Sequence, residues 1–226
     1  MNQANASHVF LLDVDNTLLD SDRFTADLHA HLTREFGQAE CDRYWAIYEQ
    51  LRTSLGYVDY LGALQRFRLE NDTRPGVFNL AYWLLDYPFE HRLYAGALEA
   101  VDELNKLGRA VILSDGDVAF QPHKIERAGI RGVVRGEVLI FVHKELALQQ
   151  MQARYPASHY VVADDKPDLL AKMKHLLGDR LTTVFVRQGH YALRANLDEL
   201  QPRPDYTINA IGELPALAAE LVRAAA

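Results

Sequence analysis

The stretch HVFLLDVDNTL, residues 8–18, decides how the rest of the chain is interpreted. Its first part, His8–Leu12, is almost entirely apolar and stops abruptly at Asp13. A short apolar run of this kind is typical of a strand buried on both faces of a parallel sheet. In an open parallel sheet, ligands bind outside the carboxyl ends of the strands. We therefore expect Asp13 and Asp15 to lie where a ligand binds.

The remaining sequence alternates between short apolar runs and longer stretches with helical spacing of apolar residues. The predicted strands after the first are Ala110–Leu113, Val138–Val142, Tyr160–Ala163 and Thr183–Val186. The predicted helices of this part are Ala97–Leu107, Ala119–Ala128, Glu145–Arg154, Pro167–Leu177 and a closing helix, Leu214–Ala226. Strands that alternate with helices over short links indicate right-handed crossovers. The predicted fold class is α/β, a doubly wound, Rossmann-like parallel sheet.

One interval interrupts this alternation. From Ser21 to Arg92 lie roughly 70 residues, where a crossover between parallel strands needs only a dozen or more. Apolar residues fall on helical faces within it, namely Phe24, Leu28, His31, Leu32 and Phe36, then Tyr44, Ile47, Tyr48 and Leu51. The sequence thus predicts an α/β core from residues 1–20 and 93–226, interrupted by an all-helical cap domain of residues 21–92.

Composition limits the possible partners. The 226 residues include 24 Lys and Arg against 31 Asp and Glu, a net charge of −7, which argues against a nucleic-acid binder. The longest mostly apolar stretch, Val77–Leu85, is too short to span a bilayer, so we expect no membrane partner. Cys41 is the only cysteine, so no internal disulfide is possible, and the sequence shows no signal-peptide pattern. Both observations favour a cytoplasmic location. We expect a monomer or a homodimer that binds a small molecule.

Polar residues follow three of the predicted strands. Asp13 and Asp15 follow the strand His8–Leu12, and Ser114 and Asp115 follow Ala110–Leu113. The acidic segment 164–168 follows Tyr160–Ala163, and Lys144 opens the helix before that strand. Several carboxylates converging on one crevice would repel each other without a cation, and an all-oxygen cluster suits Mg²⁺. The hydroxyl, the lysine and helix-start N–H groups suit a phosphate.

These segments resemble the four motifs of the haloacid dehalogenase-like hydrolase superfamily, most of whose members are phosphatases. Residues 13–18 match its aspartate-x-aspartate-x-threonine motif, Ser114 the second motif and Lys144 the third. The segment Asp164–Asp168 matches the acidic fourth motif, with Ala163 where glycine is common. The resemblance also includes a helical cap inserted after the first motif.

The resemblance implies a role for each matching residue. Asp13 would be the nucleophile that forms an aspartyl-phosphate, and Asp15 the general acid and base. Since two neighbouring carboxylates do not both ionise easily, we expect Asp15 to keep its proton near neutral pH. The residues expected to bind the phosphate are Thr17, Ser114, Asp115 and Lys144. The expected Mg²⁺ ligands are Asp13, the Asp15 carbonyl and Asp164, with Asp165 and Asp168 as further or alternative candidates.

The predicted function is Mg²⁺-dependent hydrolysis of a phosphomonoester of a small metabolite. An alkoxide leaving group needs a proton, which Asp15 supplies, whereas a halide does not, so dehalogenation is disfavoured. A phosphomutase of the same family is the alternative, and a non-hydrolytic phospho-receiver module is a weaker one. Two aspartates also have simpler interpretations, because Asp117 and Asp165 could each do no more than cap a helix. The particular substrate stays open.

Overall fold

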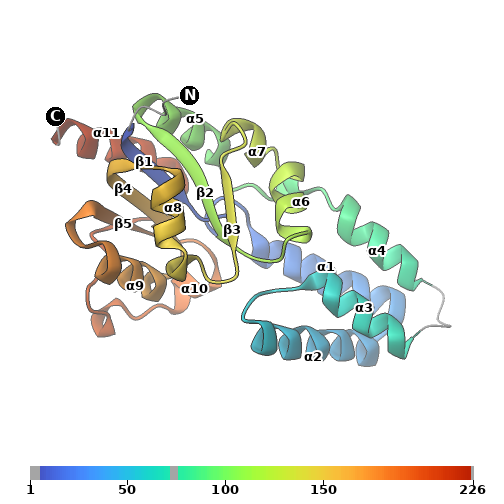
Figure 1. Cartoon of the computed structure of the whole chain (residues 1–226). Coiled ribbons are helices and arrows are strands. Elements are labelled where there is room, and N and C mark those ends of the chain that lie inside the picture. The colour runs from blue at the N-terminus through green and yellow to red at the C-terminus, as the bar shows by residue number, and fades with distance from the viewer. Residues whose placement is uncertain (1–5, 72–75, 225–226) are drawn as a thin grey trace.

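The computed structural model describes residues 6–71 and 76–224, and its centre is a parallel sheet in the order β3-β2-β1-β4-β5-β6 (Figure 1). The strands are β1 (Ala6–Leu12), β2 (Arg109–Asp115), β3 (Val138–Phe141), β4 (Ala157–Asp164), β5 (Leu181–Val186) and β6 (Tyr206–Ile208). In the register, Leu12 lies opposite Ile112 on one side and Ala163 on the other. The residues that follow β1, β2 and β4 therefore emerge together at one edge of the sheet.

The helices connect the strands as the alternating pattern predicts. After the first strand come α1 (Ser21–Phe36), α2 (Gln38–Leu55), α3 (Tyr60–Glu70) and α4 (Val77–Asp86). The later helices are α5 (Ala97–Leu107), α6 (Phe120–Arg127), α7 (Ile130–Val133), α8 (Leu148–Arg154), α9 (Pro167–Leu177), α10 (Gly189–Arg194) and α11 (Leu214–Ala224). The doubly wound α/β fold is confirmed. The start of the predicted helix Glu145–Arg154 is wrong, since Lys144–Leu146 forms a separate 3₁₀ turn before α8.

Alternate residues of each central strand pack on opposite faces of the sheet. Phe10 and Leu12 of β1 belong to a core with α5, α6, α7 and α11, whereas Val9 and Leu11 pack with α8, α9 and α10. Both faces are thus covered, as expected for an all-parallel sheet. The short edge strand β6, which has only one fully buried residue, carries too little apolar signal to be predicted.

Helices α1–α4, which we call the helical segment, lie beyond one end of the sheet (Figure 1). The face predicted for α1 is buried at Phe24, Leu28, His31 and Leu32. The two connections of the segment to the core run side by side, because Leu19 forms a bridge with Leu93. These connections begin directly after the loop that carries Asp13 and Asp15, so the helical segment is positioned over that loop.

Candidate active site

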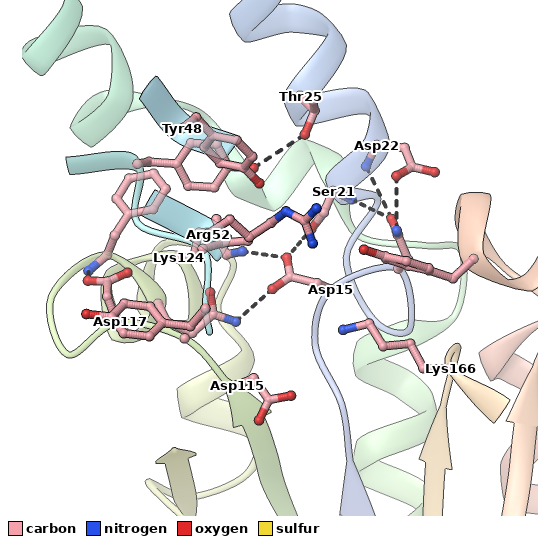
Figure 2. Close-up of a pocket in the computed structure, with 18 of the residues that line it drawn as sticks. Asp15, Ser21, Asp22, Thr25, Tyr48, Arg52, Asp115, Asp117, Lys124 and Lys166 are labelled. Atoms are coloured by element: carbon pink, nitrogen blue, oxygen red, sulfur yellow. Dashed lines mark hydrogen bonds and ion pairs between the residues drawn. The ribbon is translucent and has the colours of Figure 1, made fainter. Parts of the chain in front are cut away.

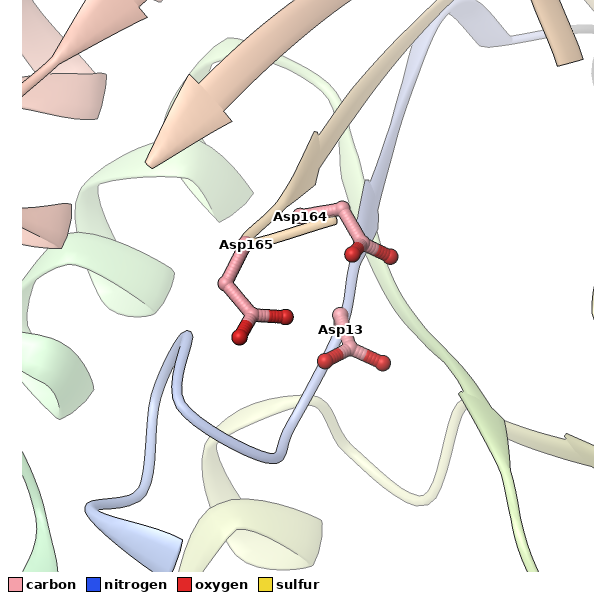
Figure 3. Close-up of side chains that lie close together, drawn as sticks. All are labelled: Asp13, Asp164 and Asp165. Atoms are coloured by element: carbon pink, nitrogen blue, oxygen red, sulfur yellow. The ribbon is translucent and has the colours of Figure 1, made fainter. Parts of the chain in front are cut away.

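Three buried carboxylates meet beneath the carboxyl ends of β1 and β4. Asp13, Asp164 and Asp165 each place a carboxylate oxygen within 4.8 Å of the others (Figure 3). Asp13 is 4% exposed and the other two are fully buried. In the described part of the chain, Asp13 Oδ2 and both oxygens of Asp165 have no hydrogen-bond partner. Buried, unpartnered and mutually repelling oxygens are a donor set that fits a divalent metal ion.

The pKa values of this group reflect its burial. Burial, together with the neighbouring charges of Asp164 and Asp13, raises the pKa of Asp165 to about 9. Burial also raises the pKa of Asp13, while the charge of Lys144 opposes this. The cluster therefore holds at least one proton at neutral pH until a cation replaces it.

Lys144 supplies the positive charge of the cluster. It follows β3 in a 3₁₀ turn, and its ammonium contacts Asp13 and lies 2.6 Å from Asp164 Oδ2. Its backbone N–H donates to Asp115 Oδ1 at 2.7 Å, which ties the loops after β2 and β3 together. Burial lowers the pKa of Lys144, but the charges of Asp13 and Asp164 outweigh burial and raise it. Lys144 is therefore a fixed cation beside the expected nucleophile.

Asp15 is held by residues of α6 and α1 rather than by its own loop. It contacts the Lys124 ammonium and the Ser21 hydroxyl, and Gln121 Nε2 donates to its Oδ2 at 2.9 Å. Burial alone would raise the pKa of Asp15, but Lys124 and these hydrogen bonds lower it to about 2. The expectation that Asp15 keeps its proton is therefore wrong in this structure, because the neighbour that dominates Asp15 is a lysine and not a second carboxylate.

A cavity of about 220 Å³ lies between the sheet edge and the helical segment (Figure 2). Asp15, Asp115, Lys124 and Lys166 line it from the core side. From the helical segment it is lined mainly by aromatic and basic side chains, which are Tyr48, Arg52, Tyr57 and Tyr60. A small molecule in this cavity would contact Asp15 directly and reach toward Asp13 below it.

The loop that carries the first motif is fixed by a local network. Asn16 adopts a positive φ of 58°, a conformation that asparagine tolerates better than most residues. Its Oδ1 accepts hydrogen bonds from the backbone N–H groups of Ser21 and Asp22, at 3.1 and 3.2 Å. Asp22 in turn accepts a bond of 2.5 Å from His190 Nδ1 of α10. The loop, the start of α1 and α10 are thereby joined at the base of the helical segment.

Most residues singled out from the sequence come together, but two do not. Asp13, Ser114, Lys144, Asp164 and Asp165 form the buried group, with Asp15 and Asp115 at the cavity wall. Thr17 is fully buried, does not line the cavity, and has no hydrogen-bond partner for its hydroxyl within residues 6–71 and 76–224. Asp168 is exposed on the first turn of α9 and lies outside the carboxylate group. The phosphate contact expected of Thr17 and the metal contact expected of Asp168 therefore stay predictions, because neither side chain belongs to the cavity lining or the carboxylate group.

The structure distinguishes the two aspartates that could each be a helix cap, Asp117 and Asp165. Asp117 Oδ1 accepts hydrogen bonds from the backbone N–H groups of Ala119 and Phe120, at 2.8 and 2.6 Å, so Asp117 caps the start of α6. Asp165 makes no capping bond to α9, whose preceding residue is Lys166. The carboxylate of Asp165 lies close to those of Asp13 and Asp164 instead, so Asp165 is a stronger candidate for a metal ligand than Asp168.

Sequence reasoning missed the polar side chains of α6 and the lysine that follows the fourth motif. Gln121 and Lys124 are buried in α6 beside Phe120 and Ile125, and Gln121 also donates to Ser114 Oγ at 2.9 Å. Two polar residues on the buried face of a helix are a signal that could have identified them. Lys166 has its ammonium 5.2 Å from the Tyr191 ring centroid, a contact that no sequence pattern indicates.

The fold and the site define an α/β protein in which a buried aspartate after the central strand can act as a nucleophile. The family model for haloacid dehalogenase-like hydrolases matches residues 8–166, and the chain belongs to this family. A solved structure described as a haloacid dehalogenase-like hydrolase, from Burkholderia xenovorans, is 53% identical, with a TM-score of 0.88 and coverage of 95% of this chain and 97% of that one.

More distant structures share the fold. The L-2-haloacid dehalogenase of Xanthobacter autotrophicus, with chloropropionic acid covalently bound, is 16% identical with a TM-score of 0.62, over 93% of this chain and 98% of that one. The HAD-hydrolase YfnB of Bacillus subtilis, bound to magnesium, is 19% identical with a TM-score of 0.63 over the same shares. A search of curated proteins finds no match. Among the described helices, none combines the length and apolarity that crossing a membrane requires.

Proposed function

We propose that this protein is a Mg²⁺-dependent phosphomonoester hydrolase that acts on a small phosphorylated metabolite through an aspartyl-phosphate. The observation that carries the proposal is the pair of carboxylates after β1. Asp13 lies in the buried group beside Lys144, and Asp15 lines the cavity above it. A carbon–halogen hydrolase needs the first carboxylate only, because a halide leaves without a proton. A second carboxylate at the leaving-group side favours an oxygen ester.

The reaction divides into two displacements at phosphorus. In the first, a carboxylate oxygen of Asp13 bonds to phosphorus and the ester P–O bond breaks. An alkoxide leaving group would take a proton from Asp15, which must first bind one from solvent because Lys124 holds it ionised in this structure. In the second, water attacks phosphorus, passes a proton to Asp15, and the bond to Asp13 breaks, which releases inorganic phosphate. Ser114 and Lys144 would bind the phosphoryl oxygens and offset their growing negative charge.

The charge state of Asp15 suits one half of this reaction directly. Lys124 and Gln121 hold Asp15 ionised, and an ionised carboxylate is the form that accepts a proton from the attacking water. The first displacement requires a protonated Asp15 only if the leaving group is strongly basic. The identity of the leaving group therefore decides how much the reaction depends on Asp15.

Mg²⁺ would be held by the carboxylates of Asp13, Asp164 and Asp165, whose unpartnered oxygens fit a hard cation. When bound, the ion would neutralise the cluster and polarise a phosphoryl oxygen. The YfnB structure, which has the same fold, is bound to magnesium. The helical segment, as part of a cap of residues 21–92, would close the cavity over a small substrate and exclude water.

The test compares two substrates and two leaving groups. Wild-type protein with Mg²⁺ should hydrolyse p-nitrophenyl phosphate and should not release chloride from L-2-chloropropionate. Asp13→Asn should abolish hydrolysis, and EDTA should silence the wild type. Asp15→Asn should slow the hydrolysis of an alkyl phosphate far more than that of p-nitrophenyl phosphate, because p-nitrophenolate leaves without a proton. Asp168→Asn is the matched control and should retain activity. Chloride release without phosphatase activity would refute the proposal.

A further inference from the structure

Lys166 is the residue of the site that the roles assigned so far leave unused. It lies two residues after the end of β4 and directly precedes Pro167, the first residue of α9. A residue before proline is restricted to extended conformations, and Lys166 has φ −107° and ψ 95°. Its backbone N–H donates to Asp164 Oδ1 at 2.8 Å. The backbone conformation that directs the Lys166 side chain is therefore fixed by the same segment that carries the carboxylates of Asp164 and Asp165.

Among the described residues, the ammonium of Lys166 forms no ion pair within 4 Å, although burial, which lowers its pKa, is outweighed by the more distant charges of Asp13 and Asp164, which raise it. Within the part of the chain that the structure describes, its one specific contact is the Tyr191 ring, 5.2 Å from the ring centroid. The site's other lysines differ, because Lys144 is paired with Asp13 and Asp164, and Lys124 with Asp15. In Figure 2 the Lys166 ammonium points into the cavity on the side opposite Lys124.

A single cation–π contact contributes too little free energy to explain why an ammonium lies in this position. Such a contact at a partly exposed ring contributes little compared with the cost of withdrawing a charge from water. Tyr191 is 43% exposed, so the contact is of this weak kind. The arrangement is best explained if Lys166 gains a stronger partner when the cavity is filled.

The charge of the site identifies that partner as an anion. Five carboxylates surround the place where a phosphoryl group would meet Asp13, and they belong to Asp13, Asp15, Asp115, Asp164 and Asp165. Lys144 and Lys124 are already paired with members of this set. Even with a divalent ion on the cluster, an arriving phosphate dianion would find few free positive charges. On the core side of the cavity, Lys166 is a cation without a close carboxylate partner among the described residues, and it can offset this charge.

We propose that Lys166 is a second cationic ligand of the substrate's phosphoryl group, in addition to Lys144, and that the Tyr191 ring positions it. This inference rests on the proposed phosphatase function, since it names a further residue of the same site. The chemical class that Lys166 recognises is a phosphate mono- or dianion. Tyr191 acts through Lys166 and is a positioning residue.

The first test measures binding of inorganic phosphate, which does not require turnover. Titration calorimetry in Mg²⁺ should show that Lys166→Met weakens phosphate binding on the order of 10-fold or more, as expected for loss of a charged hydrogen bond. Lys166→Arg should restore most of the affinity, because it restores the charge. Lys172→Met, which removes an exposed lysine from the same helix, is the matched control and should bind as the wild type does.

The second test separates Lys166 from Tyr191. With p-nitrophenyl phosphate, Lys166→Met should raise KM and the inhibition constant of phosphate together. Tyr191→Phe should behave like the wild type because it keeps the ring, whereas Tyr191→Ala should shift KM in the direction of Lys166→Met but by less. A purely structural role of Tyr191 would instead lower kcat and thermal stability and leave KM unchanged, which would overturn the positioning role.

The outcomes distinguish this inference from the proposed function. If the wild type hydrolyses phosphomonoesters and Lys166→Met leaves both KM and phosphate affinity within twofold, the Lys166 inference is overturned alone. If the wild type binds phosphate without hydrolysing esters, and Lys166→Met loses that binding, the hydrolase proposal fails while the Lys166 inference is supported.

Discussion

Replacing Asp165 by asparagine should make the metal-free protein more stable, which is unusual for a change at a buried polar residue. Asp165 is fully buried, and its pKa is raised from 3.8 to about 9 by burial and by the charges of Asp164 and Asp13. Folding at pH 7 therefore forces this carboxyl to take up a proton that the unfolded chain would release. An asparagine at this position carries no such requirement.

The magnitude follows from the linkage between protonation and folding. Because the folded pKa is raised, the destabilisation is absent below pH 3.8 and grows as the pH rises toward the folded value. It amounts to about 2 kcal/mol at pH 5 and about 4 kcal/mol at pH 7, at roughly 1.4 kcal/mol per pH unit. Since a buried amide also needs partners, we expect Asp165→Asn to recover only part of this, about 1–3 kcal/mol at pH 7.

Thermal unfolding followed by circular dichroism in EDTA measures the effect. At roughly 2–4 °C per kcal/mol for a chain of this size, Asp165→Asn should raise Tm by roughly 2–12 °C at pH 7 and by less at pH 5. Saturating Mg²⁺ should reverse the order, because the wild type gains about 2.7 kcal/mol at one hundred times Kd and the variant loses a ligand. Asp168→Asn, at an exposed position, is the control and should change little.

Two results would refute this reasoning. One is a metal-free Asp165→Asn variant that is less stable than the wild type at pH 7. The other is a gain in stability that does not depend on pH, since the cause would then be packing rather than the forced uptake of a proton.

Three further predictions concern residues around the site. Lys124→Met should lower kcat/KM for p-nitrophenyl phosphate by roughly 10- to 100-fold, the effect of removing one charged hydrogen bond, while Lys124→Arg should retain most of it. Gly189→Ala should lower Tm by several degrees, because Gly189 has φ +73° and a Cβ there would lie 2.4 Å from Asn16 Cβ. Calorimetry should show a loss of about 1–3 kcal/mol in the free energy of unfolding. Phe24→Ala should cost about 3–5 kcal/mol in urea unfolding, since this fully buried ring contacts Phe89 and Phe120; a loss below 1 kcal/mol would show that the helical segment unfolds separately.

The sequence predicts the sheet well because its strands are buried on both faces. Runs such as Ala110–Leu113 are apolar throughout, and the helices Ala97–Leu107 and Pro167–Leu177 occur with the predicted bounds, each followed by glycine. The signal fades at the edges, where burial is partial. Strand β6 (Tyr206–Ile208) is exposed at two of its positions, so its sequence contains no apolar run from which a strand could be predicted.

The candidate site shows a similar limit. Residues at strand ends can be predicted to meet, because topology alone brings Asp13, Ser114 and Asp164 together. The surroundings of each carboxylate depend on side chains that arrive from distant elements. Lys124, from α6, reverses the expected protonation of Asp15, and Asp165 rather than the exposed Asp168 completes the buried group. These contacts are set by helix orientation, which the spacing of residues along the chain does not encode.

The paired connections at Leu19 and Leu93 have an evolutionary consequence. The backbone N–H of Asp20 donates to the Arg92 carbonyl at 2.7 Å, so an insertion begins and ends at almost the same point in space. Exchanging the inserted helices for others would therefore leave the strands undisturbed and cost little loop-closure entropy. Such an exchange is constrained by the contacts between the helices and the core, among them the rings of Phe24 and Tyr60 against Phe120. A replacement module that supplies equivalent rings would place a different cavity lining over the same edge of the sheet.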